Sequence, residues 1–117
     1  SFKTIFETHV NMFEYYIIFL TFIKIIVKNF ILDNNLPVIL IESEATYLLW
    51  IDCSKICLDT DELCDFIREK TGLYLSSGKQ YGESGKSFIR MNIACPKTRL
   101  NDGLNRFKLG INLYLNR

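Results

Sequence analysis

A long apolar run near the start of the chain limits what it can fold into more than any other feature. Residues 12–27 read MFEYYIIFLTFIKIIV, which on hydropathy alone suggests a membrane-spanning segment. Glu14 and Lys24 leave only nine uncharged residues between them, whereas a helix needs roughly 20 to cross a bilayer. The run therefore predicts a buried helix of several turns that stops at Asn34-Asn35. A membrane anchor remains the alternative.

Length and charge exclude several classes of protein. With 117 residues and 13.7 kDa, the chain is large enough for one small domain and too small for two. The formal net charge of +1 gives no basic field of the kind that binds polyanions, so we expect no nucleic acid and no membrane as partners. Nine Phe residues and a positive mean hydropathy exceed what one small core can readily bury. Some apolar surface is therefore expected to face another domain or a partner.

The apolar period changes after Pro37, where two short runs follow each other. VILIE at 38–42 and TYLLWID at 46–52 predict two neighbouring strands. In the second strand, Trp50 shares one side with Leu48 and Asp52, while Leu49 and Ile51 share the other. Both sides carry large apolar residues, so we expect both faces to be covered.

The middle of the chain predicts a helix and then a glycine-rich loop. Asp59 and Glu62 have the spacing of a capping box and Gly72 is a typical stop, which predicts a helix over 60–71. LYLSSG at 73–78 predicts a short strand that leads into the loop. The loop glycines are Gly78, Gly82 and Gly85, and they predict a shaped loop rather than a floppy one.

The last third predicts one strand and one helix. FIRMNIA at 88–94 alternates, so that Ile89 and Met91 form an apolar face while Arg90 and Asn92 share the other. Thr98 is expected to cap a final helix. Its apolar face would carry Leu100, Leu104, Phe107 and Ile111.

Together these elements predict an α+β fold in the order helix, strand, strand, helix, strand, strand, helix. Its small, mostly antiparallel sheet of three to four strands would pack against helices. We expect residues 1–35 to form the N-terminal apolar helix and 36–117 the α+β small domain, within one domain overall.

The four cysteines, Cys53, Cys57, Cys64 and Cys95, have neither the spacing of zinc knuckles nor that of a disulfide scaffold. One histidine is available as a further metal ligand. We expect reduced, packed thiols and no metal site, although a zinc site remains an alternative. Reduced thiols favour a cytoplasmic protein.

Three segments resemble one family. EATYLLWIDCS at 44–54, GKQYGESGKSFIRMNIACP at 78–96 and RLNDGLNRFKLGI at 99–111 resemble the C-terminal small domain of class I/II, fold-type I enzymes that use pyridoxal 5'-phosphate (PLP). This family contains aminotransferases and the MalY/PatB-type cystathionine β-lyases, which are C–S lyases. The resemblance covers about 36–114. Taken alone, the segment 78–96 could be a structural turn followed by a surface arginine.

The resemblance implies that Arg90 binds the α-carboxylate of an amino-acid substrate. A planar guanidinium offers two parallel donors to a carboxylate and so fixes its orientation, which a lysine cannot do. Further substrate contacts that the resemblance implies are Ala45, Thr46, Tyr81, Gly82 and Asn92. Each has a structural alternative, since Tyr81 could simply pack, Asn92 could bond to the backbone, and Ala45 stands where the family commonly has glycine.

The resemblance also implies that parts of the enzyme lie outside this sequence. The family keeps its Schiff-base lysine and its phosphate-binding residues in a large domain upstream, and no lysine here lies in a segment like the Schiff-base motif. We therefore expect PLP in the full-length enzyme, a missing N-terminal PLP-binding domain as partner, a homodimer, and a chain that alone binds no cofactor and is inactive. The lyase and aminotransferase activities both remain open. The alternatives from other classes are a free-standing, non-catalytic interaction domain, a truncated gene remnant and a small membrane-anchored protein.

Overall fold

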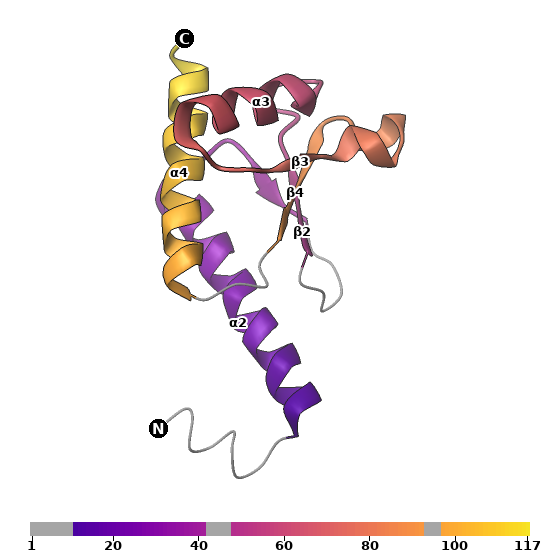
Figure 1. Cartoon of the computed structure of the whole chain (residues 1–117), viewed down its shortest axis with the longest axis vertical. Coiled ribbons are helices and arrows are strands. Elements are labelled where there is room, and N and C mark those ends of the chain that lie inside the picture. Colours follow the sequence, from indigo (N-terminus) through magenta and orange to yellow (C-terminus); the bar gives the residue numbers. More distant parts are fainter. Residues whose placement is uncertain (1–10, 42–47, 93–96) are drawn as a thin grey trace.

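The computed structural model describes residues 11–41, 48–92 and 97–117. Within these residues, three helices, four strands and two single 3-10 turns follow one another (Figure 1). In order, they are α2 (Met12–Asp33), β1 (Ile39–Leu40), β2 (Leu48–Asp52), α3 (Thr60–Thr71), β3 (Ser76–Ser77), η1 (Gly78–Tyr81), η2 (Glu83–Gly85), β4 (Phe88–Asn92) and α4 (Lys97–Leu115). The predicted order of helices and strands is confirmed.

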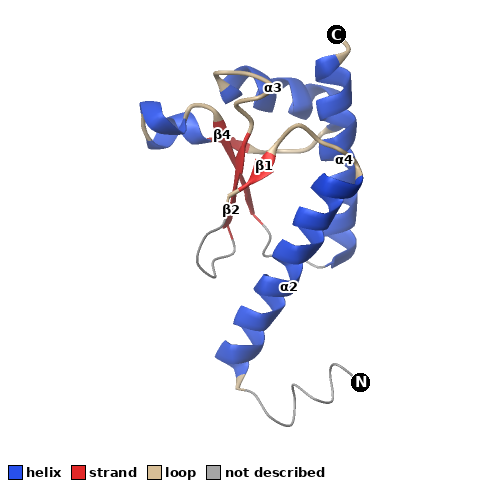
Figure 2. Cartoon of the chain, turned by 180° about the vertical axis from the view of Figure 1, so that it is seen from behind, coloured by secondary structure: helices blue, strands red, loops and turns tan. Residues whose placement is uncertain are grey.

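The four strands form one antiparallel sheet in the order β1-β2-β4-β3. Helices α2 and α4 lie on the same side of this sheet, and α3 packs against α4 at one end (Figures 1 and 2). The η1 and η2 turns project from the other side of the molecule (Figure 1). The α+β fold with a small antiparallel sheet is therefore as predicted.

The hydrophobic core lies between the sheet and the helices. Alternate residues of the two central strands are buried, namely Leu49 and Ile51 of β2 and Ile89 and Met91 of β4. Helical residues that complete this core are Leu20, Ile23, Val27 and Ile31 of α2, Leu63 and Ile67 of α3, and Leu100, Leu104, Phe107 and Ile111 of α4. The alternation predicted for both strands and the apolar face predicted for the last helix are confirmed.

Helix α3 has the ends that its sequence predicts. The side chain of Asp59 accepts a hydrogen bond from the backbone N–H of Asp61 at 3.0 Å, as an N-cap residue does. Gly72 ends the helix with φ 77°, a left-handed conformation that glycine adopts without strain.

The start of α4 differs from the prediction. The helix begins at Lys97, so Thr98 lies inside its first turn and is not the cap. The apolar period of this helix begins only at Leu100, and the polar residues before it carry no signal that locates the first turn. The prediction of Thr98 as the cap was therefore wrong.

Helix α2 ends where its sequence predicts but is more exposed than predicted. It runs to Asp33 and ends at Asn34, the predicted stop. One side is buried, whereas Phe13 is 72% exposed, Ile25 52% and Leu32 62%. The first turns extend beyond the sheet and the other helices (Figure 1), so they find no core to enter. The prediction of a buried helix therefore holds for one side only, and by length and composition this helix could also cross a membrane.

Candidate functional site

Three polar or aromatic side chains stand in a row across the sheet. Arg90 of β4 lies directly opposite Trp50 of β2 and directly opposite Ser76 of β3. Directly paired residues share one face of an antiparallel sheet, and the buried Ile89 and Met91 occupy the other face of β4. The row therefore lies on the face opposite the helical core, which we call the open face. The expectation that both faces of the Trp50 strand are covered holds only for the core face, because Trp50 stays partly exposed on the open face.

The guanidinium of Arg90 is held by two hydroxyl groups. Its Nη1 atom donates to the hydroxyl of Tyr81, and its Nη2 atom lies 3.5 Å from Oγ of Ser76. The guanidinium carbon also lies 5.1 Å from the centre of the Tyr81 ring, within cation–π range. An arginine has five N–H donors, so these two contacts leave donors for a ligand.

Tyr81 is in turn supported by Trp50. The two rings meet edge to face, with centroids 5.3 Å apart and planes at 83°, an arrangement that aromatic pairs favour. Tyr81 nevertheless stays 53% exposed. Its ring therefore forms part of the surface beside Arg90 and is not buried in the core.

The loop that carries Tyr81 is closed by a contact between two glycines. A Cβ atom on Gly85 would lie 2.5 Å from the carbonyl oxygen of Gly78, and one on Gly78 would overlap the carbonyl of Gly85. Gly82, between them, has φ 121°, a region that favours glycine. The predicted shaped loop is confirmed. Gly82 needs the backbone freedom of glycine, whereas Gly78 and Gly85 are needed because a Cβ atom at either position would not fit.

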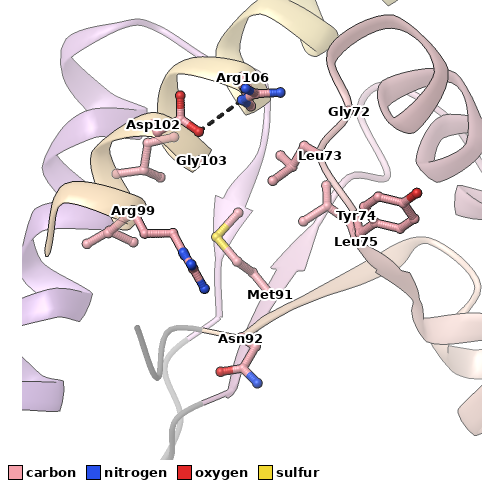
Figure 3. A pocket seen from close by; sticks show the side chains of 12 residues that line it. Gly72, Leu73, Tyr74, Leu75, Met91, Asn92, Arg99, Asp102, Gly103 and Arg106 are labelled. Atoms are coloured by element: carbon pink, nitrogen blue, oxygen red, sulfur yellow. Dashed lines mark hydrogen bonds and ion pairs between the residues drawn. The ribbon is translucent and has the colours of Figure 1, made fainter. Parts of the chain in front are cut away.

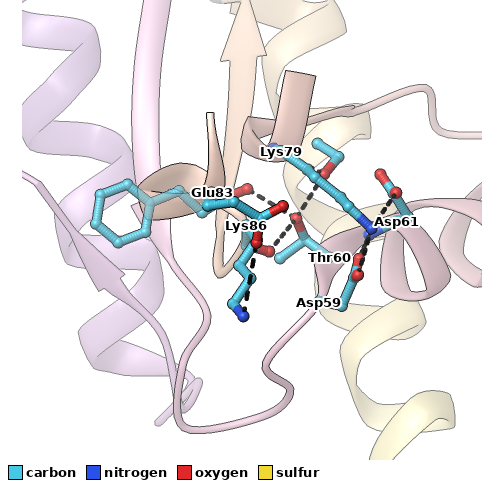
Figure 4. Close-up of polar contacts among 8 residues, drawn as sticks. Asp59, Thr60, Asp61, Lys79, Glu83 and Lys86 are labelled. Carbon is cyan, nitrogen blue, oxygen red and sulfur yellow. Dashed lines mark hydrogen bonds and ion pairs between the residues drawn. The ribbon is translucent and has the colours of Figure 1, made fainter. Parts of the chain in front are cut away.

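A buried threonine fixes the loop to helix α3 (Figure 4). The Oγ1 atom of Thr60 lies 2.8 Å from Oγ of Ser77, 3.0 Å from the carbonyl oxygen of Lys86 and 2.9 Å from that of Phe88. Ser77 also accepts from the backbone N–H of Lys79 at 3.2 Å. Both ends of the loop are thus bonded to one side chain.

An ion pair on the surface reinforces this attachment. The Nζ atom of Lys79 lies 2.8 Å from Oδ2 of Asp59 and 3.6 Å from Oδ2 of Asp61 (Figure 4). The hydrogen bond from Lys79 lowers the pKa of Asp59, and the same bond raises the pKa of Lys79. All three groups are exposed, so this pair adds less to stability than the buried threonine does.

The structure brings some of the predicted site residues together and not others. Arg90 and Tyr81 are in contact, and Asn92 lies on the same face of β4, opposite Leu48. Gly82 serves the turn after Tyr81. Ala45 and Thr46 lie outside the described residues.

Sequence reasoning missed two members of the site, Trp50 and Ser76. The alternation of residues 46–52 placed Trp50 on one face of its strand, but only the strand register shows that it faces Arg90. Ser76 carried no signal, because serines before a glycine-rich loop are common in turns.

A groove of about 670 Å³ runs between the segment 72–75 and α4, and the side chain of Arg99 points into it (Figure 3). Arg106, on its wall, donates from Nε to Oδ2 of Asp102 at 2.9 Å. Asn92 lines the groove and Arg90 does not. We place the candidate site at Arg90 because an arginine held by two hydroxyls can recognise a carboxylate, whereas volume alone specifies no ligand.

Known proteins resemble the chain over most of its length. No protein-family model matches it. Cystathionine beta-lyase PatB from Bacillus subtilis (strain 168) is 35% identical over 81 residues, which are 68% of this chain and 21% of PatB. Protein MalY from Escherichia coli (strain K12) is 33% identical over 61 residues, which are 52% of this chain and 16% of MalY.

The fold agrees with a solved structure as well. A PLP-bound protein from Clostridium difficile 630, described as an aminotransferase, matches with a TM-score of 0.77 and 31% identity over 84% of this chain and 25% of that one. The part matched in the two curated relatives is only 16% to 21% of their length. Both sequence and fold thus lead to one conclusion: this chain belongs to the family of PLP-dependent aminotransferases and C–S lyases.

Proposed function

We propose that this chain is the C-terminal domain of a PLP-dependent C–S lyase of the cystathionine β-lyase type, in which Arg90 binds the α-carboxylate of the amino-acid substrate. The observation that carries the proposal is the guanidinium of Arg90 on the open face of a central strand, held by the hydroxyls of Tyr81 and Ser76. The similarity to cystathionine beta-lyase PatB supports the lyase class.

The chemistry of Arg90 suits this role. A guanidinium binds a carboxylate through two parallel charge-assisted hydrogen bonds, which fix both its position and its plane. In an enzyme that breaks a bond next to the α-carbon, this anchor would orient the substrate relative to the reacting group. A rigid strand is a suitable support, because small displacements of an orienting group cost rate.

The residues around Arg90 do not by themselves fit PLP. This cofactor needs a lysine amine for its aldehyde and donors for its phosphate, and the described strands β2, β3 and β4 carry no lysine. Lys79 lies within the loop and Lys86 at its end, and they lie against the carboxylates of Asp59 and Glu83, respectively. PLP would therefore belong to a part of the enzyme beyond this chain, where it would supply the electron sink for β-elimination, and the chain alone would be inactive.

A second candidate function rests on a different observation. The exposed apolar side of α2, which includes Phe22, Ile25 and Leu32, is what a free-standing interaction domain would present to a partner. This reading needs neither PLP nor a substrate. It competes with the first, in which a further domain of the same protein covers this side.

The first test is the reading frame upstream of Ser1 in the source DNA. The enzyme proposal expects roughly 270 further codons, the length that the family resemblance implies, with a Schiff-base lysine motif among them. A stop codon close to Ser1 would contradict it and favour the interaction domain or a gene remnant.

The second test is kinetic and uses the complete protein. We expect Arg90→Lys to raise KM and to lower kcat/KM for cystathionine by about a hundredfold, because a lysine loses the two-donor geometry. Arg68→Lys, at an exposed position of α3, is the matched control and should leave both constants unchanged. Unchanged kinetics in Arg90→Lys would refute the assignment.

Release of pyruvate and a thiol from cystathionine, measured against amino-group transfer to a keto acid, separates the lyase from the aminotransferase.

A further inference from the structure

We propose that Tyr81 is a positioning residue for Arg90. Its hydroxyl, together with that of Ser76, would hold the guanidinium in one plane and leave the remaining N–H donors for the carboxylate. This inference rests on the proposed function of Arg90 and assigns the residues that make its side chain a preformed carboxylate site.

The contacts of Arg90 differ from those of a surface arginine that merely pairs with an acid. Its Nη1 atom donates to Tyr81 and its Nη2 atom faces Ser76, so both terminal nitrogens have a neutral oxygen partner. A carboxylate partner would neutralise the guanidinium and compete with the substrate, whereas hydroxyls fix the group and leave its charge in place. The arrangement therefore orients the arginine without reducing its attraction for an anion.

Orientation matters because arginine has a long, flexible side chain. A free guanidinium loses rotational freedom when it binds, and that loss weakens the affinity. At Arg90 part of this loss has already occurred on folding, because Tyr81 covers the guanidinium and bonds to it. The site would thus bind a carboxylate more tightly than an unrestrained arginine would.

Strand β3 connects this site to the core. Successive residues of a strand point to opposite faces, and here Ser76 meets Arg90 while Ser77 meets the buried Thr60. The same Thr60 is bonded to the carbonyl groups of Lys86 and Phe88 at the far end of the loop. Tyr81 is therefore carried by a loop that is anchored at both ends, and its ring also rests against Trp50.

The first experiment measures the guanidinium directly in the 117-residue chain. In a ¹⁵N-labelled sample, restrained rotation should give separate Nη signals for Arg90, assigned by their loss in Arg90→Lys. Tyr81→Phe keeps the ring and removes only the hydroxyl, so it should average these signals. Tyr74→Phe, which removes the hydroxyl of a 77% exposed tyrosine, is the control and should leave them separate. Averaged signals in the unchanged chain, or no effect of Tyr81→Phe, would overturn the proposal.

The second experiment measures coupling in the complete enzyme. We expect Tyr81→Phe to raise KM about tenfold, more than it changes kcat, because a hydrogen bond to a charged group is lost. In an Arg90→Lys background the same substitution should have no further effect on KM. If Arg90→Lys leaves KM unchanged, the proposed function fails. If Arg90→Lys raises KM and Tyr81→Phe does not, only the positioning role fails.

Discussion

The side chains of Thr60 and Ser77 meet 2.8 Å apart, which joins the first turn of α3 to the strand that leads into the Tyr81 loop. Thr60 is fully buried, and its Oγ1 atom also lies within 3.0 Å of the carbonyl oxygens of Lys86 and Phe88. A buried hydroxyl with this many partners is costly to remove, because the groups around it lose its contact and stay away from water, although the carbonyl of Lys86 keeps the hydrogen bond from the backbone N–H of Thr60. The contact therefore links the stability of the core to the shape of the site.

We expect Thr60→Val to lower the free energy of unfolding by about 1–3 kcal/mol, since valine has the same shape and lacks the hydroxyl. Urea denaturation of the 117-residue chain measures this. Thr21→Val is the matched control, because the Thr21 hydroxyl bonds only locally, to the carbonyl of Ile17, on an exposed part of α2. The control should change stability by less than about 0.5 kcal/mol. Equal losses in both variants would show that the Thr60 network adds nothing.

Two glycines of α4 should respond in opposite directions to the same substitution. A Cβ atom on Gly110 would lie 2.8 Å from Cγ1 of the buried Ile67, where α3 and α4 touch. On Gly103 it would find Leu73 at 3.8 Å, an ordinary contact distance. We expect Gly110→Ala to destabilise the chain by about 1–3 kcal/mol and Gly103→Ala to stabilise it by up to about 1 kcal/mol through helix propensity. Thermal unfolding checks both, and a gain in stability with Gly110→Ala would contradict the close helix packing.

The parts of this fold that could be predicted from sequence are those specified by neighbouring residues. Helix α3 has its cap at Asp59 and its stop at Gly72 as the sequence indicates. The strands around Trp50 and Arg90 follow from alternation. Both signals are local, so a single sequence contains them.

Relationships between distant segments could not be predicted in the same way. No local pattern in the sequence reveals the register that places Trp50 opposite Arg90, or Ser76 on the other side of it. The identification of Arg90 as the candidate anchor came from family resemblance, and its contact with Tyr81 appears only in the folded chain. The exposure of Ile25 was missed for a similar reason, since apolar composition does not say how much core a helix will meet.

The ion pair between Lys79 and Asp59 predicts a specific dependence of stability on pH. The hydrogen bond from Lys79 holds the pKa of Asp59 below its ordinary value, so folding favours the ionised carboxylate. The stability that the Asp59 carboxylate contributes is fully present above the pKa that Asp59 has in the unfolded chain. It is lost as pH falls through the lower pKa that Asp59 has in the folded chain.

We expect Asp59→Asn to remove this acid dependence, since asparagine still caps α3 and cannot ionise. Urea midpoints of both proteins, measured from pH 7 down to pH 2.5, should differ most at neutral pH and converge in acid. Asp65→Asn, at an exposed position within α3, controls for the general loss of a carboxylate. A constant difference between Asp59→Asn and the unchanged chain at every pH would contradict the prediction.

The described cysteines should differ in reactivity according to their burial. Burial is the largest cause that raises the pKa of Cys53 far above its ordinary value and that of Cys64 to about 12. Cys57, which is only half-buried, also has a raised pKa, with burial again the main cause. Because the thiolate is the reactive form, alkylation of the folded chain at pH 8 should modify Cys57 before Cys53 or Cys64.

Peptide mapping by mass spectrometry measures the alkylation of each thiol separately. In urea, where the chain is unfolded, the alkylation rates of the three thiols should become similar. Modification of Cys53 as fast as Cys57 in the folded chain would contradict the core packing.

The same pKa shifts predict a loss of stability in alkali. The unfolded chain gives up its thiol protons at lower pH than the folded chain does. The contribution of the buried thiols to the free energy of unfolding is therefore complete below the ordinary thiol pKa and declines as pH rises above it.

The exposed side of α2 predicts how the isolated chain behaves in solution. Phe22 is 45% exposed, Ile25 52% and Leu32 62%, and helical spacing places them along one side. Exposed apolar stripes of this kind drive association, so we expect the 117-residue chain to self-associate with rising concentration, without PLP. Ile25→Glu should shift sedimentation toward the monomer. Leu58→Glu, at a 75% exposed leucine in the loop before α3, should not. A chain that stays monomeric at all concentrations yet binds lipid vesicles would instead favour the membrane alternative for this helix.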